Sequence, residues 1–172
     1  MNENFERVKI DQALSTKYPE QIVAVSSVDN SGQPNAIILG WSMIASGNPP
    51  MMAIAIDRNN YSNQLIKECQ EFVLAFPSPD VEEQVEFCGS KSGRDYQNKL
   101  KECGWETEAA EIVAPPLLKG CIANFECTVE KQVEAGDHTT FFGEIVAAHK
   151  NKENLERLYN FGDGVFAPAA KK

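Results

Sequence analysis

Apolar and β-branched runs separated by turn-forming residues follow one another in the first third of the chain and predict β-structure. Residues 21–29 are rich in Val, Ile and Ser, and residues 35–41 supply a second segment of the same kind. Residues 29–33 between them have the Asp, Asn and Gly of a tight turn, so the two segments are expected to pair as an antiparallel hairpin. Residues 51–57 are almost continuously apolar, which is typical of a strand buried on both faces.

The rest of the chain continues with strands that are separated by short helices. A hydroxyl near the start of residues 61–69 and apolar residues at helical spacing predict a capped helix there, followed by a strand over residues 71–76. Residues 121–134 and 139–150 predict two long strands joined by a tight turn. Further helices are predicted at residues 10–17, 77–88, 94–103 and 152–159, and a Gly-rich tail follows.

This order of elements predicts one domain over residues 1–172, mainly β with flanking helices. Strands joined by tight turns favour a six-stranded antiparallel Greek-key barrel, with a sandwich of the same strands as the alternative. Neither Gly-x-Gly-x-x-Gly after a strand nor Gly-x-x-x-x-Gly-Lys occurs in the sequence. The dinucleotide-binding and P-loop fingerprints are therefore absent.

Composition and charge narrow the classes of partner. The 172 residues are 42% apolar and 24% charged, as in an ordinary globular protein, and the formal net charge is −9. Such a field repels nucleic acid and anionic membranes, although a few placed cations can still bind a small anion. The apolar stretch at residues 51–56 is far shorter than a membrane span, and residues 1–7 contain no apolar leader. We expect a cytoplasmic protein without nucleic-acid or membrane partners.

Five cysteines form an odd set without a Cys-x-x-Cys pair, so they are expected to be reduced and structural. A metal site would need closely spaced Cys and His ligands, but Cys121 and Cys127 lie six residues apart and the only histidines are His138 and His149, so a structural role is expected.

Four polar clusters fall in predicted loops or strand ends, where functional groups are most often found. Residues 40–50 contain Trp41, which on residue chemistry alone is expected to be a core side chain. Residues 58–62 place a cation and a hydroxyl ahead of a helix, an arrangement suited to phosphate or to a simple N-cap. Residues 89–95 with Lys99 gather hydroxyls and cations, and His138 lies in the turn between the long strands.

Together these clusters resemble the FMN-binding split-barrel flavin reductases, and within them the flavoredoxin-like branch. The resemblance covers residues 21–150, and residues 160–172 match only loosely. The resemblance rests on four groups of motifs, in this order along the chain: Trp41-Ser42 with Ser46-x-x-Pro49-Pro50, then Arg58-x-x-Tyr61-Ser62, then Phe87-Cys88-Gly89 with Ser92-Gly93-Arg94-Asp95, and finally Gly136-Asp137-His138 with Phe142-Gly143-Glu144.

The resemblance implies an FMN site and assigns a part to each cluster. It implies that residues 41–44 meet the ring and its polar edge, and that Arg58 and Ser62 serve the phosphate, joined by Ser92, Arg94 and Lys99 from the next loop and helix. It also implies that Lys99 and His138 lie near the flavin, where His138 would stabilise charge at N1 and act as the catalytic residue. Either Phe161 or Phe166 would cover the ring. The implied cofactor-binding residues are Asn35, Trp41, Ser42, Met43, Ile44, Ser46, Arg58, Tyr61, Ser62, Ser92, Arg94, Lys99, His138 and Phe166.

The implied reaction is hydride transfer from NADH or NADPH to the flavin, which then passes electrons to an acceptor. The resemblance also implies a homodimer. Two alternatives remain open from the sequence. One is a flavoredoxin-type electron carrier reduced by a protein partner, and the other is a split-barrel binding module that has lost the flavin.

Overall fold

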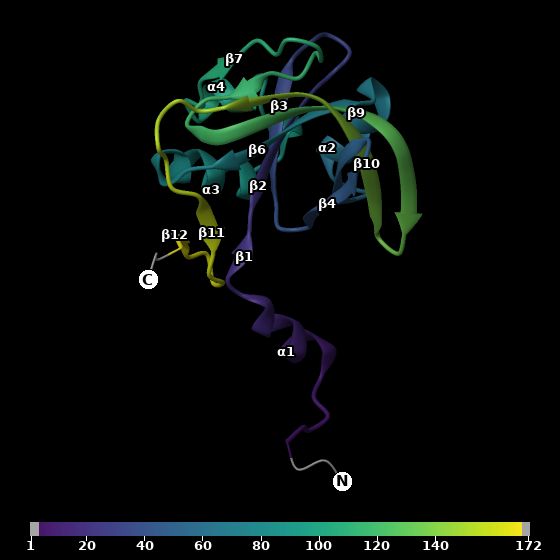
Figure 1. Ribbon diagram of the computed structural model, residues 1–172, viewed down its shortest axis with the longest axis vertical. Helices are drawn as coiled ribbons and strands as arrows, with labels where there is room; N and C mark the ends of the chain where they lie inside the picture. Colours follow the sequence, from purple (N-terminus) through teal and green to yellow (C-terminus); the bar gives the residue numbers. More distant parts are fainter. Residues whose placement is uncertain (1–3, 170–172) are drawn as a thin grey trace.

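The computed structural model describes residues 4–169, and its largest element is one strongly curved sheet (Figure 1). Seven antiparallel strands lie in the order β3-β2-β6-β9-β10-β5-β4. They are β2 (Val23–Val28), β3 (Pro34–Leu39), β4 (Ser42–Gly47), β5 (Pro50–Asp57), β6 (Glu71–Pro77), β9 (Cys121–Ala135) and β10 (His138–Lys150). The chain passes from β3 at one edge directly to β4 at the other, a crossover typical of Greek-key barrels.

The sheet curls so that strands from both edges share one interior. Ile37 of β3 packs in the same apolar cluster as Ile54 and Ile56 of β5, although these strands lie at opposite sides of the sheet order. Successive residues of a strand point to opposite faces, and Val23 and Val25 of β2 accordingly enter this interior cluster. The expected barrel therefore has a continuous apolar core.

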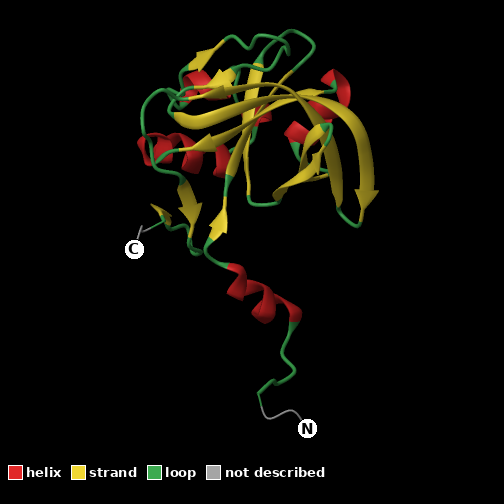
Figure 2. Cartoon of the chain, viewed as in Figure 1, coloured by secondary structure: helices red, strands yellow, loops and turns green. Residues whose placement is uncertain are grey.

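The helices α3 (Glu82–Ser90) and α4 (Lys99–Glu102) pack on the outer face of β2 and β3 (Figure 2), whereas Ile66 of the helix at residues 61–69 enters the interior cluster. Ala24 and Ala36 point outward into a second cluster with Val85, Leu100 and Trp105. The helical segments between β5 and β7 are α2 (Tyr61–Cys69), η2 (Pro79–Val81), α3 (Glu82–Ser90), η3 (Gly93–Asp95) and α4 (Lys99–Glu102). No helix within residues 4–169 is long and apolar enough to cross a membrane.

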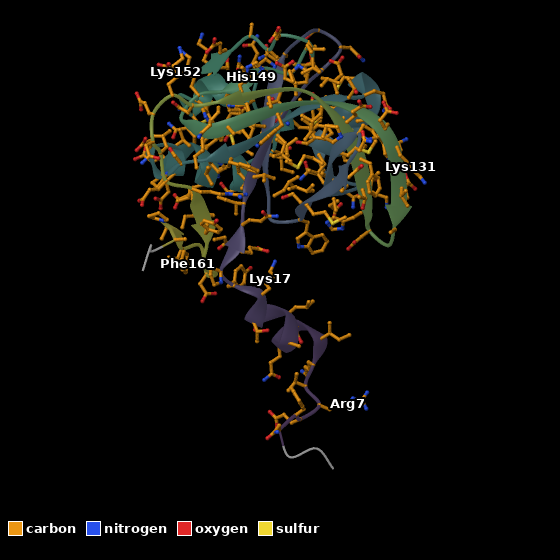
Figure 3. All side chains as sticks on the ribbon, in the orientation of Figure 1. Arg7, Lys17, Lys131, His149, Lys152 and Phe161 are labelled. Carbon is orange, nitrogen blue, oxygen red and sulfur yellow. The ribbon has the colours of Figure 1, made fainter. Side chains whose placement is uncertain are left out.

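Two small sheets and an N-terminal arm complete the described chain. The strands β1 (Glu20–Gln21), β11 (Leu158–Asn160) and β12 (Phe166–Pro168) form one small sheet, and β7 (Thr107–Glu108) pairs with β8 (Leu117–Leu118). The arm comprises α1 (Ile10–Leu14) and η1 (Ser15–Lys17) and extends away from the barrel, as Figure 1 and the positions of Arg7 and Lys17 in Figure 3 show. Phe161, which follows β11, lies near Lys17 at the same end of the barrel (Figure 3).

The structure corrects three sequence predictions. The main sheet has seven strands rather than six, because residues 42–47 pair with β5 as an edge strand instead of forming a loop. The helix predicted at residues 152–159 is absent: this segment is irregular and then becomes β11, which pairs with β1 and β12. The helix predicted at 94–103 is reduced to η3 and the four-residue α4.

Candidate functional site

A groove of about 650 Å³ opens between the end of β3, the end of β5, the start of α2 and the loop after α3. Its volume lies within the range of sites that hold small organic ligands and cofactors. The groove brings together residues that are far apart in the sequence. Its lining consists of residues 37–41, 55–57, 59–62 and 88–94 together with Lys99 and His138.

Cations gather at one end of the groove. Arg94 donates hydrogen bonds to the Asn59 carbonyl and to Gln64 Oε1, both at 3.2 Å, and its guanidinium lies over the Tyr61 ring at 5.0 Å. Lys91 lies in the same wall. The N-terminus of α2 also faces the groove, and the dipole of a helix favours an anion at that end. This end is therefore suited to a negatively charged group, although the whole chain is acidic.

A buried amide orients the Ser62 hydroxyl in this wall. Asn35 Nδ2 donates a hydrogen bond of 2.8 Å to Ser62 Oγ, and both side chains are buried. Because Ser62 Oγ accepts from Asn35, its own hydrogen is available for an acceptor in the groove. Asn35 itself does not line the groove, so its contribution is to position Ser62.

The backbone of Gly93 lies directly against this pair. A Cβ atom at residue 93 would collide with Asn35 Oδ1 and would meet Tyr61 Cδ1 at 3.0 Å. Only glycine allows the loop to approach so closely. The backbone at η3, just after α3, can thereby approach Asn35 of β3 closely.

Lys99 is the most deeply buried cation at the site, with 3% of its surface exposed. Its ammonium group donates to the carbonyls of Ala36 and Cys88, both at 2.8 Å, which occupies two of its three hydrogens. Burial lowers the pKa of Lys99, because the charged form loses solvation. Two carbonyl partners fix the position of this charge, and an anion in the groove would stabilise it further.

Trp41 and His138 form an aromatic part of the groove lining. Their ring centroids are 4.5 Å apart, and His138 Nδ1 lies 2.6 Å from Asp137 Oδ1. The hydrogen bond with His138 lowers the pKa of Asp137, so its carboxylate accepts the Nδ1 hydrogen and leaves Nε2 for another partner. Trp41 is 54% exposed, so the expectation that it is a core residue is wrong.

The structure brings half of the expected cofactor-binding residues to the groove and places the others elsewhere. Trp41, Tyr61, Ser62, Ser92, Arg94, Lys99 and His138 line it. Ser42, Met43, Ile44 and Ser46 lie on β4 outside the lining, Arg58 pairs with Glu134 at 3.8 Å, and Phe166 packs against the outer core cluster. The aromatic cover expected from Phe166 is therefore not at this groove in the described chain.

Several lining residues were not singled out from the sequence. Asp57 ends β5 beside His138, and its carboxylate, the Asp137 carboxylate and the imidazole have ligand atoms within 4.8 Å of one another. Asn59 and Asn60 complete the turn into α2, where the Asn60 side chain accepts from the Ser62 backbone N–H. The Asn-Asn pair ahead of a helix was a usable signal for this turn, whereas nothing in the sequence indicates which side chains face the groove.

Comparison with known proteins gives the family. The family model described as "Flavin reductase like domain" matches residues 15–169. The chain is 36% identical to an uncharacterized protein of Archaeoglobus fulgidus over 141 residues, which are 81% of this chain and 77% of that protein. It is 26% identical to a flavin reductase of Pseudomonas putida over 157 residues, or 91% of this chain and 88% of that protein.

A solved structure confirms the fold. The crystal structure of a flavoredoxin from Methanosarcina acetivorans superposes with a TM-score of 0.84 at 24% identity, and the match covers 98% of this chain and 94% of that one. The chain therefore belongs to the flavin reductase-like split-barrel family, as the resemblance of its motifs indicated.

Proposed function

We propose that the protein binds FMN in this groove and acts as a flavin reductase-type oxidoreductase. The observation that supports the proposal is that one groove is lined by two chemically different groups of residues. Arg94, Lys91 and Lys99 with the Ser62 hydroxyl form an anion-binding group, and Trp41 with His138 forms an aromatic group. FMN combines the two corresponding parts, a phosphate and a planar ring system.

In the anion-binding group, the donor set suits a phosphate. Ser62 supplies a hydroxyl hydrogen, Arg94 supplies a guanidinium held over Tyr61, and the start of α2 supplies a favourable dipole. Lys99 keeps one ammonium hydrogen beyond its two carbonyl partners. We assign the phosphate to Arg94 rather than to Arg58, because Arg58 is paired with Glu134 outside the lining.

In the aromatic group, Trp41 and His138 would hold the ring. The Asp137 carboxylate fixes the imidazole through Nδ1, so His138 Nε2 can hold or donate a proton at the edge of a bound ligand. A hydrogen-bonding or positive group at that position favours the reduced form of a flavin and thus raises its midpoint potential. Bound FMN would supply the redox chemistry, accepting a hydride from NADH or NADPH and passing the electrons to an acceptor.

Binding of FMN is tested by titrating the apoprotein and following quenching of flavin fluorescence. Arg94→Ala should raise the dissociation constant roughly tenfold, or about 1.4 kcal/mol, the scale of one partly solvated charge-assisted hydrogen bond. Arg58→Ala is the matched control, since it removes the same charge outside the groove, and it should change the constant less than twofold. Equal effects of the two variants, or no binding by the wild type, would refute the assignment.

Anaerobic mixing with NADH and NADPH tests the reductase activity. Bleaching of the oxidised flavin absorbance by either nucleotide supports a flavin reductase. A flavin spectrum that neither nucleotide bleaches, but that a chemical reductant does, would instead support a flavoredoxin-type electron carrier, as the structural similarity to a flavoredoxin favours. A protein that stays colourless after incubation with FMN would support a binding module that has lost the flavin.

We further propose that two copies of the chain associate through β4 and the N-terminal arm. Met43 and Ile44 on the edge strand β4 are 57% and 76% exposed, and Ile10 and Leu14 on the arm are 79% and 61% exposed. An open edge strand and an amphipathic arm with apolar surface are suited to a symmetric interface between identical chains. Sedimentation analysis should give twice the mass of one chain.

A further inference from the structure

Two cysteines that the proposed function does not use meet between α3 and α4. Cys88 lies near the end of α3, and Cys103 follows the last residue of α4, with the two sulfurs 3.9 Å apart. The five cysteines of the chain are free thiols in the structure. Cys88 is 2% exposed and belongs to the wall of the groove, whereas Cys103 is half-buried. The pair thus reaches from the groove toward the surface.

We propose that Cys88 and Cys103 form a reversible dithiol–disulfide site that low-molecular-weight disulfides oxidise. The Cys103 sulfur attacks a small disulfide, forms a mixed disulfide and releases one small thiol. The Cys88 sulfur then attacks the Cys103 sulfur and displaces the second small thiol. Two protein thiols are oxidised and one small disulfide is reduced, so the two electrons and two protons lost by the protein end on the released thiols. This proposal does not depend on FMN binding.

The surroundings of the two sulfurs set this order of events. Burial raises the pKa of Cys88 to about 12, even though the charge of Lys99 opposes the effect, so Cys88 stays a protonated thiol near neutral pH. An oxidant in solvent can reach the half-buried Cys103 more readily than the buried Cys88. Cys103 therefore meets the oxidant, and Cys88 resolves the mixed disulfide, at a rate that increases with pH.

Closure of the disulfide needs only a local change. An S–S bond is about 2.05 Å long, so the two sulfurs must approach by roughly 2 Å, a movement on the scale of a rotamer change. The helix α4 has four residues and ends before Gly104, whose φ of +68° suits a glycine turn. Lys99 begins the same helix and donates to the Cys88 carbonyl, so the disulfide and the groove share one small structural unit.

Thiol counting tests the proposal directly. The folded protein is incubated with oxidised glutathione, acid-quenched, unfolded and titrated for free thiols. The wild type should fall from five thiols to three, and peptide mapping should recover Cys88 joined to Cys103. Cys69→Ser is the matched control, because Cys69 is also half-buried but lies apart from the pair, and this variant should fall from four thiols to two. Dithiothreitol should restore the original counts.

Two further variants separate the roles of the sulfurs. Cys103→Ser should keep all four of its thiols. Cys88→Ser should instead gain the mass of one glutathione, because the mixed disulfide on Cys103 then has no resolving thiol. Five thiols remaining in the wild type, a mapped link through any other cysteine, or loss of two thiols from Cys103→Ser would overturn the proposal. Peptide mapping of the oxidised wild type tests for the Cys88–Cys103 disulfide even where a variant fails to fold.

Discussion

The carboxylate of Glu126 allows a quantitative test of the fold. Its side chain is fully buried on β9, where Oε1 accepts from the backbone N–H of Glu111 and Oε2 accepts from those of Ile112 and Val113, at 2.7 to 3.0 Å. His149 Nε2 lies 2.6 Å from Oε1. One buried charge therefore holds the loop at residues 111–113 against the sheet.

Replacement of Glu126 by Gln keeps the shape but removes the charge. With the amide oxygen in place of Oε2, the bonds to Ile112 and Val113 survive as neutral hydrogen bonds, each about 1 kcal/mol weaker than the charge-assisted bond. The amide nitrogen then faces the N–H of Glu111, which loses its acceptor. We expect a loss of about 2 to 3 kcal/mol in the free energy of unfolding at pH 7.

The loss should depend on pH in a defined direction. Burial alone would raise the pKa of Glu126, but the three backbone donors and His149 outweigh it and hold the pKa below its ordinary value of 4.5. A carboxyl whose pKa is lowered by folding stabilises the protein above the unfolded pKa, and this stability is lost as pH falls through the folded pKa. The difference in the free energy of unfolding between wild type and Glu126→Gln should therefore be largest at pH 7 and should shrink below about pH 4.5.

Urea unfolding at a series of pH values measures this difference. If the free energy of unfolding falls by about 2 kcal/mol for each molar of urea, the urea midpoint of Glu126→Gln should lie roughly 1 M below that of the wild type at pH 7. Glu71→Gln is the control, since Glu71 accepts a single N–H, from Ala114 at 2.8 Å, and should lose less than half as much. Equal midpoints for Glu126→Gln and wild type at pH 7, or a difference that stays constant down to pH 3, would refute this reasoning.

Three further predictions concern the groove and the proposed interface. Asn35→Leu should weaken FMN binding about as much as Ser62→Ala, because each removes the oriented hydroxyl, and additive losses in the double variant would contradict a shared role. His138→Ala should lower the flavin midpoint potential more than it weakens binding, and potentiometry that finds no shift would remove His138 from the site. Ile44→Asp should halve the mass found by sedimentation, whereas an unchanged mass would place the interface elsewhere.

Much of the fold could be predicted because its strands carry strong local signals. The hairpin formed by β2 and β3, the helix α2 and the long pair β9 and β10 lie within a residue or two of their expected bounds. The strand β2 was predictable because Val and Ala residues on both of its faces enter apolar clusters and give a recognisable β-rich run. The strand β4 was missed because its residues precede Asn48-Pro49-Pro50 and read as a loop, whereas pairing with β5 decides their structure.

The site was predictable as a set of segments but not as a set of side chains. Spacing placed both Arg58 and Arg94 near a helix start, and only the structure shows that Arg94 turns toward Tyr61 while Arg58 turns toward Glu134. The burial of Lys99 depends on two carbonyl groups from separate elements, which no local pattern encodes. Tertiary contacts decide such orientations.

The place of β4 would link occupancy of the groove to the proposed association of two chains. Trp41, which lines the groove, is three residues from Ile44, which belongs to the proposed interface. If a ligand orders this short strand, it should tighten the dimer, and by thermodynamic reciprocity the dimer should tighten the ligand. A dissociation constant for flavin would then vary with protein concentration, and dilution alone would release cofactor.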